Sequence, residues 1–278
     1  AKQMLSYGWK VLLTTVVYTI EGDLRSLIVG KQFGSADLAY YDQGKKFPNL
    51  LVSNINTSIS NVMFPVLSKN QDNRGRMKLI CRRAIKTSTY LLAPLLLGLI
   101  AVSNEFVRVI LSDKWLPCVP FLQILTLVYL VRPLTTTDQQ AIMSTGRSDL
   151  TLRIMIAVNV TDVILLLIAV FVMKSVIMIA VGALLTEVVS MALFMKYVKK
   201  CIGYTYLEQL SDITPSLLLA ISMGAIVYLV GKINVNVVAV LILQVVVGAG
   251  YYLVMSYILH FEPFLYLVKM LKEKFGMV

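Results

Sequence analysis

Long apolar segments recur along the whole chain, and they restrict its fold more than any other feature. Apolar residues make up 58% of the 278 residues and charged residues only 15%, and the mean hydropathy is +0.77. Soluble domains are nearer half apolar and a quarter charged. Eight segments are long enough to cross about 30 Å of hydrocarbon: Leu5–Gly30, Leu38–Leu67, Leu79–Val102, Val119–Ser144, Leu150–Val172, Val176–Val198, Ile213–Val230 and Val237–Leu259. Since backbone polar groups in lipid must be satisfied internally, we predict an all-α, polytopic transmembrane helical bundle.

The basic residues fall mainly in alternate loops between these segments. The richest clusters lie at 69–86, at 147–153, at 196–200 and at 269–274. Lys and Arg collect in cytoplasmic loops, so we expect both termini of this chain in the cytoplasm of a bacterium, with the spans in its inner (plasma) membrane. The net charge of +11 is explained by this topology rather than by nucleic-acid binding. The tail 261–278 is amphipathic and is expected to lie on the membrane surface.

Polar side chains form stripes on three of the predicted spans. The second span carries Asp42, Lys46, Asn49, Ser53, Asn56 and Ser60 at steps of three or four residues, which keep side chains on one helical face. This stripe covers about 27 Å, nearly the hydrocarbon thickness. The first span carries Tyr7, Lys10, Thr14, Tyr18, Glu21 and Arg25, and the fourth carries Gln123, Thr126, Tyr129, Arg132, Thr136, Gln139 and Gln140. Such residues can simply hydrogen-bond packed helices to one another, but three stripes with embedded charges favour a polar lumen.

Ionisable residues inside spanning helices cost at least about 2.5–3.5 kcal/mol each at the bilayer centre and usually mark a pathway or a partner. The candidates for contact with a substrate in the lumen are Lys10, Glu21, Arg25, Asp42, Lys46, Asn49, Asn56, Arg132 and Gln139. The candidates for binding a coupling ion are Asp138, Asp162 and Glu187.

Features of an enzyme or of a metal or cofactor site are not indicated by the sequence. The three cysteines are isolated and the single histidine, His260, ends the last span, so neither a disulfide framework nor a zinc site is expected. Hydrolase nucleophile motifs and phosphate-binding glycine loops are not found. We expect a protein that is not an enzyme and needs no cofactor.

Several motifs of the first half resemble a known family. They are LRSLIVGK at 24–31, ADLAYY at 36–41, Phe47-Pro48, NINTSIS at 54–60, Phe64-Pro65, KWLPCVPFLQ at 114–123 and GRSD at 146–149. This pattern resembles polysaccharide exporters of the Wzx type, which are lipid-linked oligosaccharide flippases of the multidrug/oligosaccharidyl-lipid/polysaccharide (MOP) superfamily. The first block is most similar to the colanic-acid and teichuronic-acid exporter branch, and the specific similarity extends from Trp9 to about Asp149.

The resemblance implies two six-helix lobes and an additional helix pair. This chain would begin at the seventh helix, so 1–203 would form the C-terminal lobe and 204–278 the appended pair with its amphipathic cytoplasmic tail. Its partners would then be the lipid bilayer and the N-terminal lobe. The substrate would be an undecaprenyl-pyrophosphate-linked glycan, flipped from the cytoplasmic to the periplasmic leaflet for surface polysaccharide synthesis.

Other functions stay open at this point. A related MOP transporter could carry a drug, exchanging it for a cation, or a peptidoglycan lipid precursor. An intramembrane glycan polymerase or ligase is a further alternative, although the longest predicted periplasmic loop, about 103–118, is short for a catalytic loop.

Overall fold

The computed structural model describes residues 25–233 and 236–274, and within these ranges it is a bundle of helices without strands. Seven of the helices are long and apolar enough to cross a membrane. They are α2 (Ser35–Lys69), α3 (Arg74–Ala101), α5 (Val119–Ser144), α6 (Ser148–Leu167), α7 (Val176–Ile202), α8 (Tyr206–Val230) and α9 (Val237–Ile258). The predicted polytopic helical bundle is therefore confirmed.

The predicted spans and the observed helices agree closely at most ends. Val119–Ser144 matches α5 at both ends, and α6 continues through a π-helical turn, η2 (Ile168–Val172), to the predicted end at Val172. The largest difference is α8, which starts seven residues before the predicted Ile213 because Thr205 forms a capping box with Glu208. Of the first predicted span, Leu5–Gly30, only residues from 25 onward are described, and 25–32 are helical.

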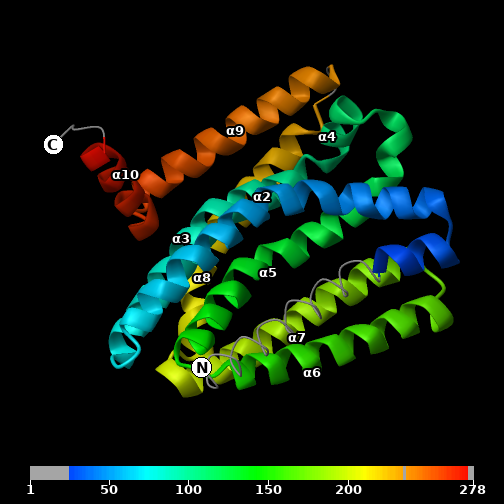
Figure 1. Cartoon of the computed structure of the whole chain (residues 1–278). Coiled ribbons are helices and arrows are strands. Elements are labelled where there is room, and N and C mark those ends of the chain that lie inside the picture. The colour runs from blue at the N-terminus through cyan, green and yellow to red at the C-terminus, as the bar shows by residue number, and fades with distance from the viewer. Residues whose placement is uncertain (1–24, 234–235, 275–278) are drawn as a thin grey trace.

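Turns between the long helices alternate between two ends of the bundle (Figure 1). The α2–α3, α5–α6 and α7–α8 turns lie at one end, and the turns at 33–34, at 173–175 and at 231–233 lie at the other. Three of the breaks between predicted spans contain a glycine with the positive φ that side chains disfavour: Gly34 (φ 103°), Gly146 (φ 76°) and Gly203 (φ 73°). The basic loops identified in the sequence thus lie at a common end, as predicted.

Helix α5 lies at the centre of the bundle and packs against α2, α3 and α7. Its closest approach to α2 is at Gly44, where a Cβ atom would come within 2.7 Å of the Cβ of Phe121 and 2.8 Å of the amide nitrogen of Leu122. Gly44 therefore lets the two backbones approach, as small residues do between membrane helices. The face of α2 that carries Tyr41, Gly44 and Pro48 is buried, and this sets the rotation of α2 about its axis.

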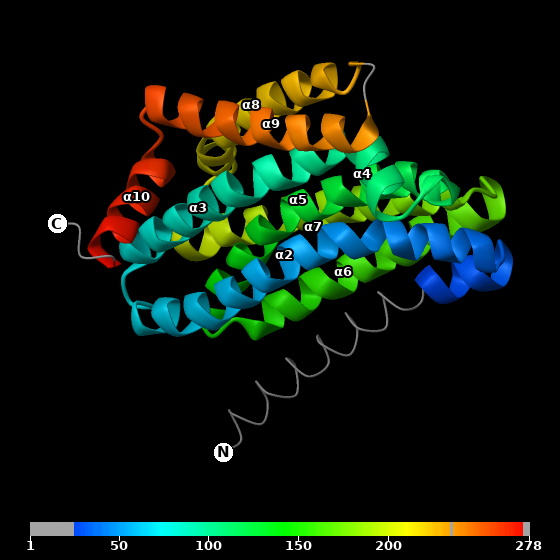
Figure 2. The ribbon, with the colours of Figure 1, turned by 90° about the horizontal axis from the view of Figure 1, so that it is seen from above.

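Helices α8 and α9 form an outer layer beside α3 (Figure 2). The predicted boundary at 203/204 falls in the turn before α8, and the division into a lobe and an appended pair remains a prediction. The short helices α4 (Ser103–Ile110) and η1 (Asp113–Cys118) lie in the predicted outer loop and were not predicted. Helix α10 (Glu262–Lys274) lies within the predicted amphipathic tail, and it packs against α3 at the basic end of the bundle.

Candidate substrate cavity

A cavity of about 450 Å³ opens between α2, α5 and α7, with contributions from α6 and Arg25. Its volume falls in the range of small-ligand pockets, about 300–1,000 Å³. Its wall combines basic, hydroxyl and amide side chains with aromatic and aliphatic ones. The polar residues that line it are Arg25, Tyr41, Lys45, Asn56, Thr57, Ser60, Tyr129, Arg132, Thr135, Thr136, Gln139, Gln140, Thr186, Glu187 and Ser190.

Most of the polar stripe predicted on the fourth span faces this cavity. Tyr129, Arg132, Thr136, Gln139 and Gln140 line it over about three turns of α5. The first two residues of the stripe, Gln123 and Thr126, make contacts elsewhere. Gln123 donates a hydrogen bond to Ser103 (2.7 Å), and the buried Thr126 donates to the carbonyl oxygen of Leu122. The spacing of the stripe thus predicted the residues of α5 that line the cavity from Tyr129 to Gln140. It did not predict that Gln123 and Thr126 make their contacts elsewhere.

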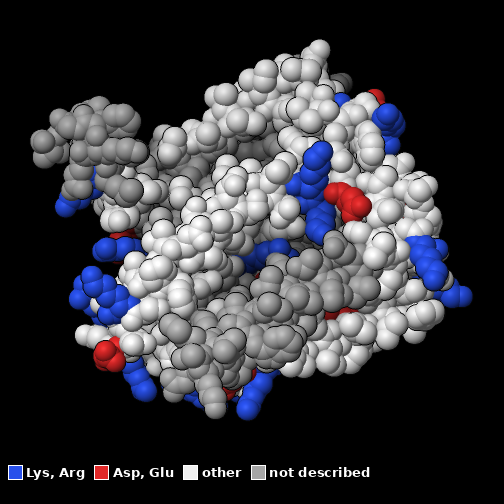
Figure 3. All heavy atoms as spheres, viewed as in Figure 1, with Lys and Arg blue, Asp and Glu red and all other residues white. Residues whose placement is uncertain are grey.

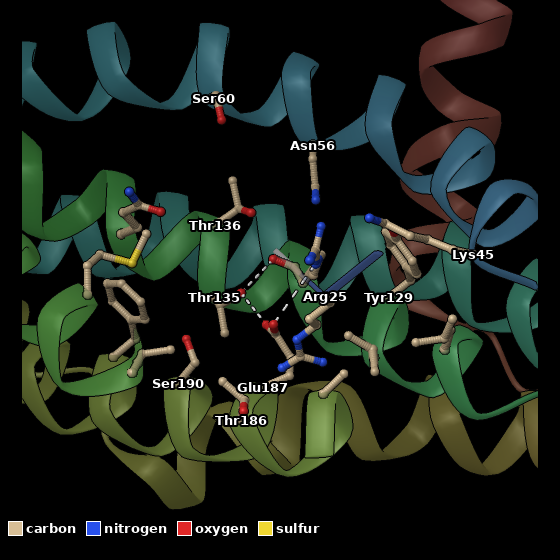
Figure 4. A pocket seen from close by; sticks show the side chains of 18 of the residues that line it. Arg25, Lys45, Asn56, Ser60, Tyr129, Thr135, Thr136, Thr186, Glu187 and Ser190 are labelled. Atoms are coloured by element: carbon tan, nitrogen blue, oxygen red, sulfur yellow. Dashed lines mark hydrogen bonds and ion pairs between the residues drawn. The ribbon is translucent and has the colours of Figure 1, made fainter. Parts of the chain in front are cut away.

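Arg132 is held by an aromatic ring and a carboxylate. Its guanidinium lies over the ring of Tyr129, 4.7 Å from the centroid, and its Nε lies 4.0 Å from an oxygen of Glu187 on α7. Thr135 donates a hydrogen bond to the same carboxylate (3.1 Å). Figure 4 shows Glu187 and Thr135 meeting across the cavity from α7 and α5. Glu187, a candidate for binding a coupling ion, is therefore in contact with Arg132 and Thr135 in this structure.

Arg25 and Asp162 form a buried ion pair at the cavity. Both are almost fully buried, at 7% and 3% exposure, and Nε of Arg25 donates to Asp162 at 3.2 Å. The hydroxyl of Thr186 donates to the other carboxylate oxygen (2.8 Å). Asp162, also a candidate for binding a coupling ion, thus has its charge met by Arg25.

On α2 the structure separates the predicted stripe into two parts. Asn56 and Ser60 line the cavity, and Oδ1 of Asn56 is buried without a hydrogen-bond partner among the described residues. By contrast, Asp42, Lys46 and Asn49 are exposed and outside the cavity. Asp42 accepts a hydrogen bond from Ser26 (2.8 Å).

Lys45, rather than Lys46, is the lysine of α2 that lines the cavity. It extends from α2 toward the side of the cavity where Tyr129 lies (Figure 4). The reason is the close packing at Gly44, which turns Tyr41, Pro48 and Val52 toward the bundle and so leaves Lys46 outside. Spacing alone did not separate the two lysines. The available signal was the small residue Gly44 between Tyr41 and Pro48, which lie on the same helical face.

Asp138 lies away from the cavity, on the opposite side of α5. It is fully buried, and neither carboxylate oxygen has a hydrogen-bond partner among the described residues. Gln209 of α8 lies beside it and is itself fully buried. Two further candidates, Lys10 and Glu21, lie outside the described residues. Within the described ranges, no group of three or more His, Cys, Asp or Glu side chains is arranged to hold a metal ion.

Together these features define a polytopic membrane bundle with a polar, net basic cavity between its helices. A family described as polysaccharide biosynthesis protein matches residues 1–120. The chain is similar to the lipopolysaccharide biosynthesis protein WzxC of Escherichia coli, at 23% identity over 233 residues, covering 80% of this chain and 46% of that protein. It is 28% identical over 153 residues to the teichuronic acid biosynthesis protein TuaB of Bacillus subtilis, covering 54% of this chain and 31% of that protein.

A solved structure has the same fold. The lipid II flippase MurJ in an inward closed conformation matches with a TM-score of 0.74 at 21% identity, over 89% of this chain and 52% of that one. The resemblance to Wzx-type exporters is thus confirmed, and the chain shares the fold of MurJ. The chain spans between 31% and 52% of the length of these relatives.

Proposed function

We propose that this chain is the C-terminal half of a transporter that flips an anionic, lipid-linked oligosaccharide across the bilayer. The observation that carries the proposal is the cavity between α2, α5 and α7, with Arg25, Lys45 and Arg132 on its wall. The names of the relatives, which concern polysaccharide biosynthesis and lipid II flipping, support the same class of substrate.

The charge of the cavity suits a phosphate-containing substrate. The three cations exceed the two carboxylates that face them, Glu187 on the wall and Asp162, which pairs with Arg25. Charges interact more strongly in a low-dielectric cavity than in water, and arginine meets phosphate oxygens with two parallel hydrogen bonds. An undecaprenyl-pyrophosphate headgroup would therefore gain compensating charge here that lipid cannot supply.

The uncharged polar groups suit a glycan. Hydroxyls of Ser60, Thr136 and Ser190, and amides of Asn56 and Gln139, line the same space, and Figure 4 shows Asn56 and Ser60 on the α2 side facing Ser190 on the α7 side. Such groups both donate and accept hydrogen bonds, as sugar hydroxyls do. The polyprenyl chain would stay in the bilayer beside the bundle.

The proposal extends to direction and to membrane. The basic loops at one end of the bundle favour a cytoplasmic position for that end, and transport would then run from the cytoplasmic to the periplasmic leaflet of a bacterial inner membrane. The N-terminal lobe would supply the facing half of the path, and alternating access would expose the cavity to each side in turn. No bond is broken in this process, so the proposed activity is transport rather than catalysis.

Complementation of a strain that lacks its own exporter tests the proposal. In the full-length gene, Lys45→Gln should lower surface polysaccharide by roughly tenfold or more, because a hydrogen bond to a charged group contributes about 1.5–3 kcal/mol. Lys232→Gln, the same change in the α8–α9 turn, should have little effect. Lys46→Gln separates the lining position from its exposed neighbour and should impair export less than Lys45→Gln. Membrane abundance is measured for each variant, and equal export by Lys45→Gln and Lys232→Gln at equal abundance would contradict the proposal.

A multidrug antiporter is the alternative with the same fold. Cationic drugs favour cavities with unpaired acids and aromatic walls, whereas here the lining cations outnumber the carboxylates. Drug resistance conferred by the full-length gene, without restored polysaccharide, would favour that alternative.

A further inference from the structure

A second cavity lies at the corner between α3 and α10, away from the central one. Its volume is about 260 Å³, and it is open to the outside. Helix α3 contributes Arg83, Lys86 and Thr87, and α10 contributes Glu262, Pro263, Leu265, Tyr266 and Lys269. Both Figure 1 and Figure 2 show α10 beside this end of α3, where the basic loops also lie. Figure 3 shows basic side chains gathered along this edge of the molecule.

Internal contacts fix the shape and the charge of this corner. Lys86 bonds to Glu262 (2.7 Å) and so ties α10 to α3. The guanidinium of Arg83 lies over the ring of Tyr266, 5.1 Å from its centroid. Among residues 25–233 and 236–269, no carboxylate lies within ion-pair distance of Arg83. Three cationic side chains and one carboxylate line the corner, so it is net positive.

The surroundings of the corner pass from polar to apolar along α3. Arg83, Thr87 and Leu91 follow one another at four-residue steps, which keep them on one side of the helix, and Leu91 and Leu95 are exposed. On α10 the apolar Leu265 and Tyr266 are exposed beside Lys269. A basic pocket with exposed apolar side chains next to it matches a molecule with an anionic head and acyl chains.

We propose that the corner between α3 and α10 binds the headgroup of an anionic phospholipid, with its phosphate at Arg83 and Lys269 and its acyl chains along the exposed leucines of α3. Basic pockets between spans near one membrane surface bind such headgroups, and an amphipathic helix at the surface strengthens the attraction to anionic lipids. A lipid held here would also fix α10 against α3. The proposal is independent of what the central cavity carries.

Native mass spectrometry of the chain in detergent tests the proposal with two lipids that have the same acyl chains. Phosphatidylglycerol should stay bound where phosphatidylcholine does not. Arg83→Gln/Lys269→Gln should weaken the binding of phosphatidylglycerol by on the order of tenfold or more, since each cation near an anionic membrane surface contributes about fivefold. The control is Lys196→Gln/Lys199→Gln, which removes the same charge from exposed positions of α7 at the same end. It should bind as the unmodified chain does.

Three outcomes would overturn the proposal. Equal retention of both lipids would mean that no anionic headgroup is selected. Equal weakening by the control pair would mean that the effect comes from the general charge of this end. Displacement of the lipid by millimolar inorganic phosphate would mean that the corner binds free anions rather than a lipid. Both variants keep the Lys86–Glu262 pair. If the double variant does not fold, the measurement is repeated with Arg83→Gln alone.

Discussion

At the scale of single residues, the buried pair of Arg25 and Asp162 could have either of two roles. It could stabilise the packing of the helices, or Arg25 could contact the substrate. The pair lies at the cavity edge, and Thr186 completes the hydrogen bonding of the carboxylate. A buried ion pair is weak evidence for stability, because desolvation offsets much of the attraction. Removing one partner is different, since it leaves an uncompensated charge among the helices.

We therefore expect a strong coupling between the two positions. Asp162→Asn should destabilise the chain by about 3–5 kcal/mol, and Arg25→Gln/Asp162→Asn should be less destabilised than Asp162→Asn alone. Thermal unfolding in detergent measures both. Losses that simply add would show that the two charges do not depend on each other. If the double variant is stable and still fails to restore export in the full-length protein, Arg25 contacts substrate as well.

The sequence predicted part of this site and missed the rest for definable reasons. The period of the α5 stripe placed Arg132 and Gln139 at the cavity. It could not show that Asp138, one position before Gln139, points to the opposite side of the helix toward Gln209. Residue type alone does not show whether a polar side chain faces a cavity or is buried between packed helices. Lys45 was missed because the rotation of α2 depends on which neighbour it packs against, and the stripe does not carry that information.

At the scale of elements, the packing of α2 on α5 controls which side chains reach the cavity. A Cβ at position 44 would meet the backbone of α5, not only the end of a flexible side chain. The contrast within the same chain is Gly250 on α9, where nothing lies within 4 Å of a built Cβ.

Replacement of these two glycines by alanine should therefore have opposite effects. Gly44→Ala should force α2 and α5 apart and lower stability by about 1–3 kcal/mol, the usual range for overpacking. Gly250→Ala should be neutral or stabilising by up to about 1 kcal/mol, since alanine is the better helix former. Unfolding midpoints in one detergent give the comparison. Equal stability of both variants would mean that the Gly44 contact is looser than the structure has it.

The helices themselves were the most predictable elements. Apolar length determines a spanning helix almost by itself, and Gly34 and Gly203, with positive φ, lie between the predicted spans. The errors came where short-range bonds outweigh hydropathy. The Thr205–Glu208 capping box starts α8 within a polar stretch. The short helices α4 and η1, of 8 and 6 residues, lie in a loop whose sequence is too short and too mixed in polarity to show a helical period.

At the scale of the whole molecule, ion pairs and basic loops concentrate at one end of the bundle. Arg82 forms two hydrogen bonds to Asp212 (2.7 and 2.8 Å), and Lys78 bonds to Glu208 (2.6 Å). These pairs join α3 to α8, so part of the basic charge of this end is used in packing. The other basic residues at this end, including Arg76, Arg147 and Lys199, are exposed. They are the residues to which the positive-inside rule applies.

Cysteine labelling in intact cells tests the resulting orientation. Cysteines placed at Arg76, Arg147 and Lys199 should be protected from a membrane-impermeant thiol reagent, and cysteines at Ser112 and Lys232 should react. All five positions are exposed, so local burial does not account for protection, and the native Cys81, Cys118 and Cys201 are buried and give a low background. Permeabilised cells supply the control, in which all five should react. Reaction of the first group in intact cells would reverse the orientation, and with it the proposed direction of transport, because the basic end would then face the periplasm.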